Sequence, residues 1–309
     1  MLVSTKRFGF TIGICASDGA ARLKELLWLI SNEKFAEELL LCRIVIVASG
    51  CPTSIIEFLR QSAKKDRRLL LIIEDVRHGK AEAIDRIIEN SVGDYLLFVN
   101  SDAVPSPGAM ATILSTLGGS GSTGVVSARP VFDSRDHHIS SIHRLMWLVH
   151  NECAETLNHM TIGNHGSDEL MAVRSDLLGP MPPGLVNDGA YISSMAKMRG
   201  YSVKFCRSAG VEIDLPDNIV NTIQQRRRII FGHFQIWKLT GEAPKTIESL
   251  LVSYPFLSLR IVAKTIARSP QLFWILPVAL VEEVVAFSFA VVDTLVSTER
   301  HGVWKRYGK

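Results

Sequence analysis

Short apolar runs alternate with amphipathic stretches throughout the first hundred residues. Four of the runs have the length and composition of buried strands, at 10–16, 44–48, 69–73 and 95–99. Three intervening stretches carry apolar side chains at helical spacing, at 20–30, 55–63 and 80–90. Such alternation is typical of parallel βαβ units with helices on both faces of one sheet. We therefore predict an α/β fold.

Ligands of open α/β sheets bind at the carboxyl ends of the strands. Asp102 follows the fourth apolar run, where a carboxylate can bind a divalent metal that holds a diphosphate. Its alternative role is that of a turn residue, because Ser101-Asp102 precedes a Pro-rich loop. Lys80 follows Gly79 at the start of a predicted helix, where free amides and a cation together can hold negative charge.

Several classes of protein are disfavoured by what the sequence lacks. It contains neither a P-loop nor a Gly-x-Gly-x-x-Gly motif after the first strand, which argues against a dinucleotide-dependent dehydrogenase. Five scattered cysteines favour neither zinc nor a disulfide framework, and they fit a reducing compartment. A net charge of only +3 gives no indication of nucleic acid. Residues 1–10 have no apolar run of signal-peptide length, so we expect a cytosolic body.

The middle of the chain is less regular. We expect strands at 125–129, 170–174 and 201–206, helices at 145–157 and 188–199, and a polar loop at 133–143. Asp188 begins the second of these helices after a Pro-Gly loop. It fits two roles, a helix N-cap or a general base beside a cleft. The histidines are spread out with no metal-ligand spacing, which favours structural or solvated roles.

The character of the sequence changes after residue 210. Residues 226–309 hold 12 Lys/Arg and 6 Asp/Glu, and the segments 250–267 and 272–296 are strongly apolar. Glu282 and Glu283 interrupt the only segment long enough to span a bilayer, so we favour helices lying in the membrane interface. Basic residues beside Trp304 suit anionic headgroups. The alternative is an amphipathic helical pair packed on the body.

A series of short motifs, in order along the chain, resembles the family 2 glycosyltransferases. The matching segments are Ile14-Cys-Ala-Ser-Asp18, Ile46-Val-Ala-Ser-Gly50-Cys-Pro-Thr53, His78-Gly-Lys-Ala-Glu-Ala83, Asn100-Ser-Asp102, Leu185-Val-Asn-Asp188 and Gln225-Arg-Arg-Arg-Ile229. The third resembles the family's Gly-Lys helix start, the fourth its DxD motif with Asn100 in the first position, and the fifth its acidic acceptor motif. The last resembles its Gln-x-x-Arg-Trp element, with Ile229 in place of the tryptophan.

The resemblance implies a GT-A fold, a mixed but mostly parallel sheet with flanking helices, and inverting sugar transfer from a nucleotide-sugar donor. It implies Asp188 as the catalytic base, Asp102 as the ligand of a divalent cation (Mn²⁺ or Mg²⁺), and two sets of binding residues. The donor would be bound by Ala16, Asp18, Ser49, Lys80, Asp85, Ser101 and Asp102. The acceptor or a phosphate would be bound by Gln225, Arg227 and Arg228.

We therefore expect a catalytic domain at 1–237 and a C-terminal apolar helical region at 238–309. The expected function is sugar transfer to a lipid-linked or glycan acceptor at the cytoplasmic side of the cell membrane, by a peripheral or monotopic protein. Two alternatives remain open. One is a sugar nucleotidyltransferase, which uses a similar sheet. The other is a non-catalytic membrane-bound partner subunit with a decayed donor site, which the missing first DxD carboxylate favours.

Overall fold

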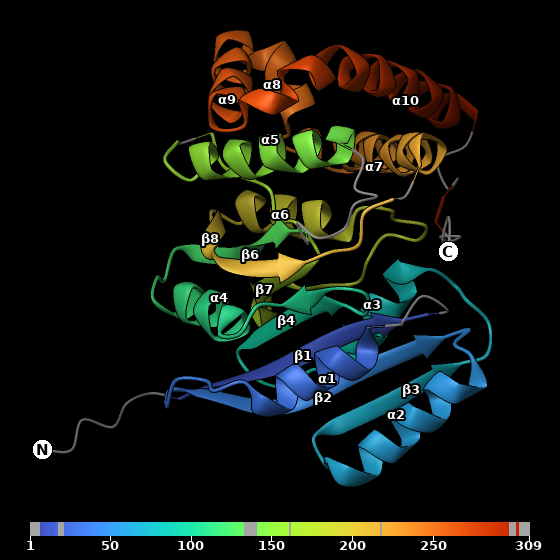
Figure 1. Ribbon diagram of the computed structural model, residues 1–309. Coiled ribbons are helices and arrows are strands. Elements are labelled where there is room, and N and C mark those ends of the chain that lie inside the picture. The colour runs from blue at the N-terminus through green and yellow to red at the C-terminus, as the bar shows by residue number, and fades with distance from the viewer. Residues whose placement is uncertain are drawn as a thin grey trace, which may run out of the picture.

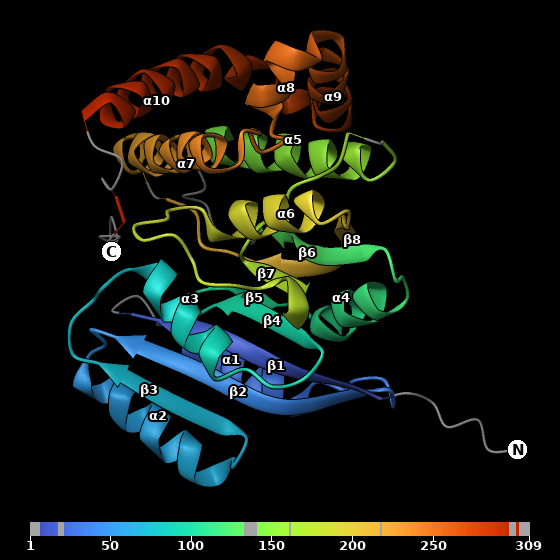
Figure 2. The same cartoon turned by 180° about the vertical axis from the view of Figure 1, so that it is seen from behind.

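A computed structural model describes residues 7–17, 22–132, 141–160, 162–216, 218–296 and 301–302. Within these residues the strands form one eight-stranded sheet in the order β3-β2-β1-β4-β7-β6-β8-β5. The strands are β1 Phe8–Ala16, β2 Leu39–Ser49, β3 Leu69–Glu74, β4 Tyr95–Asn100, β5 Val104–Pro105, β6 Thr123–Val131, β7 Leu170–Arg174 and β8 Ser202–Glu212. Figures 1 and 2 show helices on both faces of this sheet, as the sequence predicted.

The first four strands in space, β3, β2, β1 and β4, are parallel. Their side chains alternate between two cores: Tyr95, Leu97 and Val99 face one, and Leu96 and Phe98 the other. The first core is covered by α1 (Leu23–Asn32), α2 (Thr53–Lys65) and α4 (Ala109–Gly118). The second is covered by α3 (Lys80–Glu89) and α6 (Asp188–Met198). Both faces of the sheet are therefore buried, which explains the nearly continuous apolar runs.

Strand β7 reverses direction in the middle of the sheet. It pairs antiparallel with β4, Val99 lying opposite Leu170, and antiparallel with β6. β6 pairs parallel with β8, and the short β5 pairs antiparallel with β8. Because β7 is reversed, the residues just before it lie at the edge where β1, β2 and β4 end. That edge therefore receives side chains from both sides of the β4–β7 pair.

The remaining helices form two layers beyond the sheet. α5 (Ser141–Leu157) and α7 (Ile219–Thr240) lie between the sheet and an outer group made of α8 (Ile247–Ser253), α9 (Pro255–Arg268) and α10 (Leu276–Val296) (Figure 1). A short 3₁₀ segment, η2 (Pro270–Ile275), joins the last two. α5 shares a hydrophobic core with this outer group, built on Leu145, Leu250, Ile261 and Leu272. Residue 237, the predicted end of the catalytic part, lies inside α7.

Three features differ from the sequence prediction. The single helix expected at 250–267 is broken between α8 and α9, because Pro255 cannot continue a helix but suits the first position of the next. The apolar helix α4 and the two-residue strand β5 went unpredicted. Residues 141–143 of the polar loop expected at 133–143 belong to α5, which begins at Ser141, and the rest of that prediction lies outside the described residues. The other predicted strands and helices are confirmed within a few residues at their ends.

Candidate active site

A cavity of about 1020 Å³ opens at the edge of the sheet where β1, β2 and β4 end. One end is lined by residues that follow these strands; we call it the donor end, because the residues predicted to bind the donor lie there. The other end reaches between α5, α7, α8, α9 and α10. Of the predicted site residues, the lining includes Ala16, Ser49, Lys80, Ser101, Asp102, Gln225 and Arg228. Residues that lie far apart in the sequence are thus brought to one cavity by the parallel strands and by α7.

Three predicted residues are placed elsewhere, and a fourth lies outside the described residues. Asp85 accepts a hydrogen bond from the Met181 backbone N–H at 2.7 Å and does not line the cavity. Arg227 binds Asp293 on α10, and Asp188 lies just behind the cavity wall. Asp18 falls in the range 18–21, which the structure does not describe. The structure therefore does not bring Asp85, predicted to bind the donor, or Arg227, predicted to bind the acceptor or a phosphate, into the cavity lining.

Lys80 connects two carboxylates at the donor end, one half-buried and one buried. Its Nζ forms an ion pair with Asp168 Oδ2 and lies 3.1 Å from Asp188 Oδ1. Gly79, immediately before it, has a φ of 120°, a conformation that favours glycine and turns the chain into α3. The lysine is thus presented at the helix N-terminus, as predicted, but it faces carboxylates as well as the cavity.

The environment of Asp188 suits proton transfer. Asn187, and not Asp188, caps α6, its side chain accepting from the Ala190 N–H at 3.4 Å. Asp188 is only 4% exposed. Burial raises its pKa to about 6, helped by Asp168 and opposed by the ammonium of Lys80. A carboxylate with a pKa closer to neutrality is a stronger base. Of the two roles predicted from sequence, the structure assigns the N-cap to Asn187, and the catalytic role stays a prediction.

Asp168 and Glu169 were missed from sequence. Burial alone would raise the pKa of Asp168, but Lys80 lowers it below the ordinary value. Burial, with Asp168 and Asp102 nearby, raises the pKa of Glu169 to about 8. The Glu169 carbonyl accepts from the Asn100 N–H at 3.1 Å, opposite the DxD-like segment. In the sequence, these two residues are an acidic pair directly before the strand β7. The pair indicates a site residue only once β7 is known to run antiparallel to β4, because its start then lies at the edge where β4 ends.

Successive arginines of α7 point in different directions, as a helix requires of adjacent residues. Arg226 is paired with Glu248 at 2.6 Å and with Glu283 at 2.8 Å. Arg227 makes two contacts of 2.5 Å with Asp293. Arg228 faces the donor end, where its charge helps to lower the pKa of Asp168. Of these three arginines of α7, Arg226 and Arg228 line the cavity and Arg227 does not. Arg226 already has two carboxylate partners.

Four histidines scattered in the sequence meet in the wall of the cavity: His143, His150, His165 and His233. Burial lowers the pKa of all four, to about 4 in the first and third and about 3 in the others. Within the described part of the chain, no three His, Cys, Asp or Glu side chains form a cluster that could hold a metal ion by themselves. These histidines are therefore neutral, uncharged parts of the wall near pH 7.

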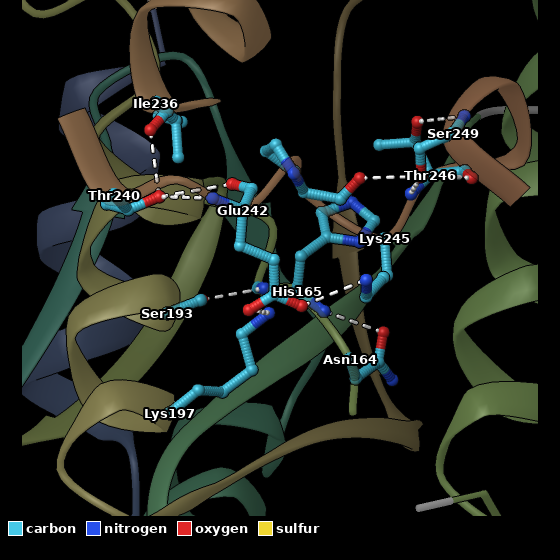
Figure 3. A network of polar contacts seen from close by, with 12 residues as sticks. Asn164, His165, Ser193, Lys197, Ile236, Thr240, Glu242, Lys245, Thr246 and Ser249 are labelled. Carbon is cyan, nitrogen blue, oxygen red and sulfur yellow. Dashed lines mark hydrogen bonds and ion pairs between the residues drawn. The ribbon is translucent and has the colours of Figure 1, made fainter. Parts of the chain in front are cut away.

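The loop that leads into α8 is tied to this wall. Glu242 binds Lys197 of α6 at 3.8 Å and Lys245 at 2.9 Å (Figure 3). Thr246 caps α8, its Oγ accepting from the Ser249 N–H, and Thr246 and His165 both line the cavity (Figure 3). The outer helices are thus held against the catalytic body by polar contacts as well as by apolar packing.

The sequence matches one protein family, and the structure is similar to several solved structures. The sequence pattern described as "Glycosyl transferase family 2" matches residues 11–176. The structure is similar to the mannosyltransferase PcManGT from Pyrobaculum calidifontis in complex with GDP-Man and Mn²⁺, with a TM-score of 0.65 and 20% identity over 94% of this chain and 88% of that one.

Two further structures are similar over 74% of this chain. S. aureus TarS has a TM-score of 0.52, 14% identity and 40% of its chain covered. GalNAc-T7 with UDP, GalNAc and Mn²⁺ has a TM-score of 0.51, 10% identity and 51% covered. At these identities the likenesses show the fold, and they confirm the GT-A architecture expected from sequence. Comparison with curated protein sequences finds no significant match.

The buried histidines predict a loss of stability in acid. Their pKa values in the folded chain lie below the ordinary 6.5, so the unfolded chain binds extra protons as the pH falls below 6.5. Each histidine then lowers the free energy of unfolding by up to about 1.4 kcal/mol per pH unit. We expect His150→Gln to be less acid-sensitive than the wild type between pH 6.5 and 5, whereas His159→Gln, at an exposed site, should follow the wild type. Urea unfolding at several pH values measures this, and parallel curves for all three proteins would contradict it.

Proposed function

Because the chain belongs to glycosyl transferase family 2 and is a glycosyltransferase, we propose that it moves a sugar with inversion from a nucleotide-sugar donor to a lipid-linked or glycan acceptor at a membrane surface. The observation that carries this proposal is the single cavity, which joins a charged donor end at the sheet edge to an apolar end between the outer helices. Transfer between a soluble donor and a membrane-borne acceptor needs both environments within one site.

The donor end suits a nucleoside diphosphate sugar. Lys80 at the N-terminus of α3 and Arg228 of α7 offer two cations and free helix amides, which favour phosphate oxygens. Ala16, Ser49 and Ser101 complete the wall with small side chains that leave room for the nucleoside. A bound diphosphate competes with Asp168 and Asp188 for the ammonium of Lys80. Donor binding would therefore uncover the carboxylate of Asp188 for the acceptor.

A divalent cation suits the carboxylates at this end, and both PcManGT and GalNAc-T7 are described with Mn²⁺. Asp102 lines the cavity, and its carboxylate lies near enough to Glu169 to add to the rise in the pKa of Glu169 that burial mainly causes. Hard carboxylate oxygens are the ligands that Mg²⁺ and Mn²⁺ prefer. We assign Asp102 as the protein ligand, the remaining ligands coming from the donor and water. Such a cation, when bound, stabilises the charge of the leaving diphosphate.

Asp188 is the proposed general base. Inversion requires a group that removes the proton of the acceptor hydroxyl on the face opposite the leaving nucleotide. Asp188 carries the raised pKa that this role needs, and before the donor binds Lys80 holds its carboxylate in place. For a phosphate acceptor, which is already anionic, Asp188 matters less and Arg228 matters more.

The outer helices support a membrane-facing surface. Large apolar side chains are exposed along all of them: Val252, Phe256, Leu259, Phe273, Trp274, Leu280, Val281, Phe287, Phe289 and Leu295. The acidic residues of α10 face inward instead, where Glu282 and Asp293 are at most 2% exposed. This arrangement is reversed relative to a helix of a soluble protein. It is the surface expected of helices whose apolar side meets lipid.

The helix pair formed by α7 and α10 favours an in-plane orientation. Pro270–Val296 is long and apolar enough to cross a membrane, with a mean hydropathy of 2.2, which is weak support for a span. α10 is fastened to α7 by Arg226–Glu283 and by Arg227–Asp293, ten residues further along. If α10 crossed the bilayer, the polar helix α7 would have to enter it too, at high cost. We therefore propose that the outer helices lie in the interface, on the cytoplasmic side that the sequence led us to expect.

Donor binding gives the first test. In a thermal-shift screen of UDP- and GDP-sugars with and without Mn²⁺, the matching donor at 100 times its Kd should stabilise the protein by about 2.7 kcal/mol. Asp102→Asn should lose the Mn²⁺-dependent part of this gain, while Asp176→Asn, exposed and outside the cavity, should keep it. Two outcomes would contradict the metal role of Asp102: an equal Mn²⁺-dependent gain in both variants, or a gain in the wild type that excess chelator does not reduce.

Sugar transfer tests the base. With the donor found in that screen and a membrane lipid extract as acceptor, Asp188→Asn should keep donor affinity but lower nucleoside diphosphate release by about two orders of magnitude or more. The loss should be smaller if the acceptor is a phosphate. Asp176→Asn again serves as control. An equal loss of donor affinity in Asp188→Asn would mark Asp188 as a structural residue of the Lys80 cluster.

Vesicle binding tests the membrane surface. Removal of Phe256 and Trp274, which are 87% and 79% exposed, should weaken binding to phosphatidylcholine–phosphatidylglycerol vesicles. A fully buried aromatic side chain contributes about 1.5–3 kcal/mol, so the Phe256→Ser/Trp274→Ser double variant should bind at least tenfold more weakly. Trp28→Ser, on α1 and 64% exposed, is the matched control. Co-sedimentation measures the binding, and full-length protein that stays in the supernatant would refute the membrane assignment.

A further inference from the structure

We infer that the apolar end of the cavity is the binding site for the hydrocarbon chain of a single-chain anionic lipid, the acceptor class of the transfer reaction. This inference rests on the proposed function, because it assigns an acceptor to the same cavity. It adds where the hydrocarbon chain lies, where it enters from the lipid phase, and that affinity depends on its length. Family membership supplies none of these.

The two ends of the cavity differ in chemistry. Far from Lys80, the walls are formed by Met146 and Val149 of α5, Val262 of α9, and Leu276 and Ala279 of α10. None of these side chains can hydrogen-bond to a sugar or a nucleotide. Cavities that hold one small ligand usually measure about 300–1,000 Å³. At about 1020 Å³, this cavity has room for a second ligand beside the donor.

The opening of the apolar end lies on the proposed membrane surface. Leu251, Leu259 and Leu280 line the cavity and are also exposed, by 53%, 60% and 63%. Their neighbours on the outer face, Val252 and Phe256, are exposed by 86% and 87%. A hydrocarbon chain can therefore pass from the lipid phase into the cavity along a continuous apolar path. That continuity selects a lipid chain over an apolar protein segment, whose backbone amides would be left unpaired there.

Charged groups lie where the two ends meet. Arg226, with its partners Glu248 and Glu283, lines the cavity between the apolar walls and the donor end, and His150 and His233 lie beside it. One guanidinium neutralises only one of the two carboxylates, so this cluster keeps a net negative charge and an anionic head group would bind beyond it, at Arg228 and Lys80. The head group would then lie beside the donor, and the chain would occupy the apolar end.

The test measures binding of unlabelled alkyl phosphates of four to twelve carbons to the full-length protein below their critical micelle concentrations, with inorganic phosphate as the chain-free reference. Each methylene buried in the cavity should tighten binding by about fourfold. Ala279→Trp fills the apolar end and should abolish this dependence on length. Val281→Trp, on the same helix but outside the cavity, should leave it unchanged.

A second pair of variants keeps the test decisive if Ala279→Trp fails to fold. Leu259→Glu places a charge at the exposed opening and should also abolish the dependence on length, whereas Val252→Glu, equally part of the outer face but not of the cavity, should retain it. A photoreactive dodecyl phosphate with a terminal diazirine should label peptides of α5, α9 and α10 in the wild type. The inference is overturned by binding that does not depend on chain length. It is also overturned by equal behaviour of cavity and control variants, which would assign the binding to the outer face alone.

Nucleotide-sugar stabilisation, measured on the same samples, separates this inference from the proposed function. If the donor binds and the alkyl phosphates show no dependence on length, the chain site fails and the transferase proposal stands with a different acceptor. If no nucleotide sugar binds at all, the donor assignment fails, and the chain-length result then decides the lipid site alone.

Discussion

The ion pairs of one turn of α7 connect the catalytic cavity to the outer helices. Arg226 fastens α8 and α10 through Glu248 and Glu283, Arg227 fastens the far end of α10 through Asp293, and Arg228 turns toward the donor. Buried ion pairs stabilise little on their own, because desolvation offsets most of the attraction. Their effect is on orientation: an unpaired Asp293, fully buried, would be costly, so α10 has one favourable way to lie on α7.

This fastening explains the unusual surface of the molecule. Once the acidic residues of α10 face α7, its valines and phenylalanines must face outward. The acidic residues that interrupt the apolar segment in the sequence are thus the reason why its apolar side is exposed. The same contacts place α8, α9 and α10 around the apolar end of the cavity, so that the proposed membrane surface and the proposed catalytic site share walls.

At the donor end, charge is arranged around Lys80. Its ammonium holds Asp168 ionised and lies 3.1 Å from Asp188, whose pKa burial raises to about 6. Glu169 beside them has a pKa raised to about 8, mainly by burial, so it is protonated near pH 7. Perturbed carboxyl groups beside two cations in one cavity are typical of a functional site, and they suit the proposed diphosphate and metal ion. In the proposed mechanism, the diphosphate of the donor binds the ammonium of Lys80 and thereby releases the carboxylate of Asp188, the proposed base.

The sequence by itself determined the βαβ half of the fold, since short continuous apolar runs and apolar side chains at helical spacing are local properties of the chain. It also located Lys80 and Asp102, because both directly follow structural boundaries that can be read along the chain. Only the tertiary structure decided what β7 and α7 contribute. Asp168 and Glu169 reach the site because β7 runs antiparallel, and a strand's direction depends on its partners rather than on its residues. The three arginines look alike in sequence, and they acquire different partners because adjacent residues of a helix point about 100° apart into different neighbours.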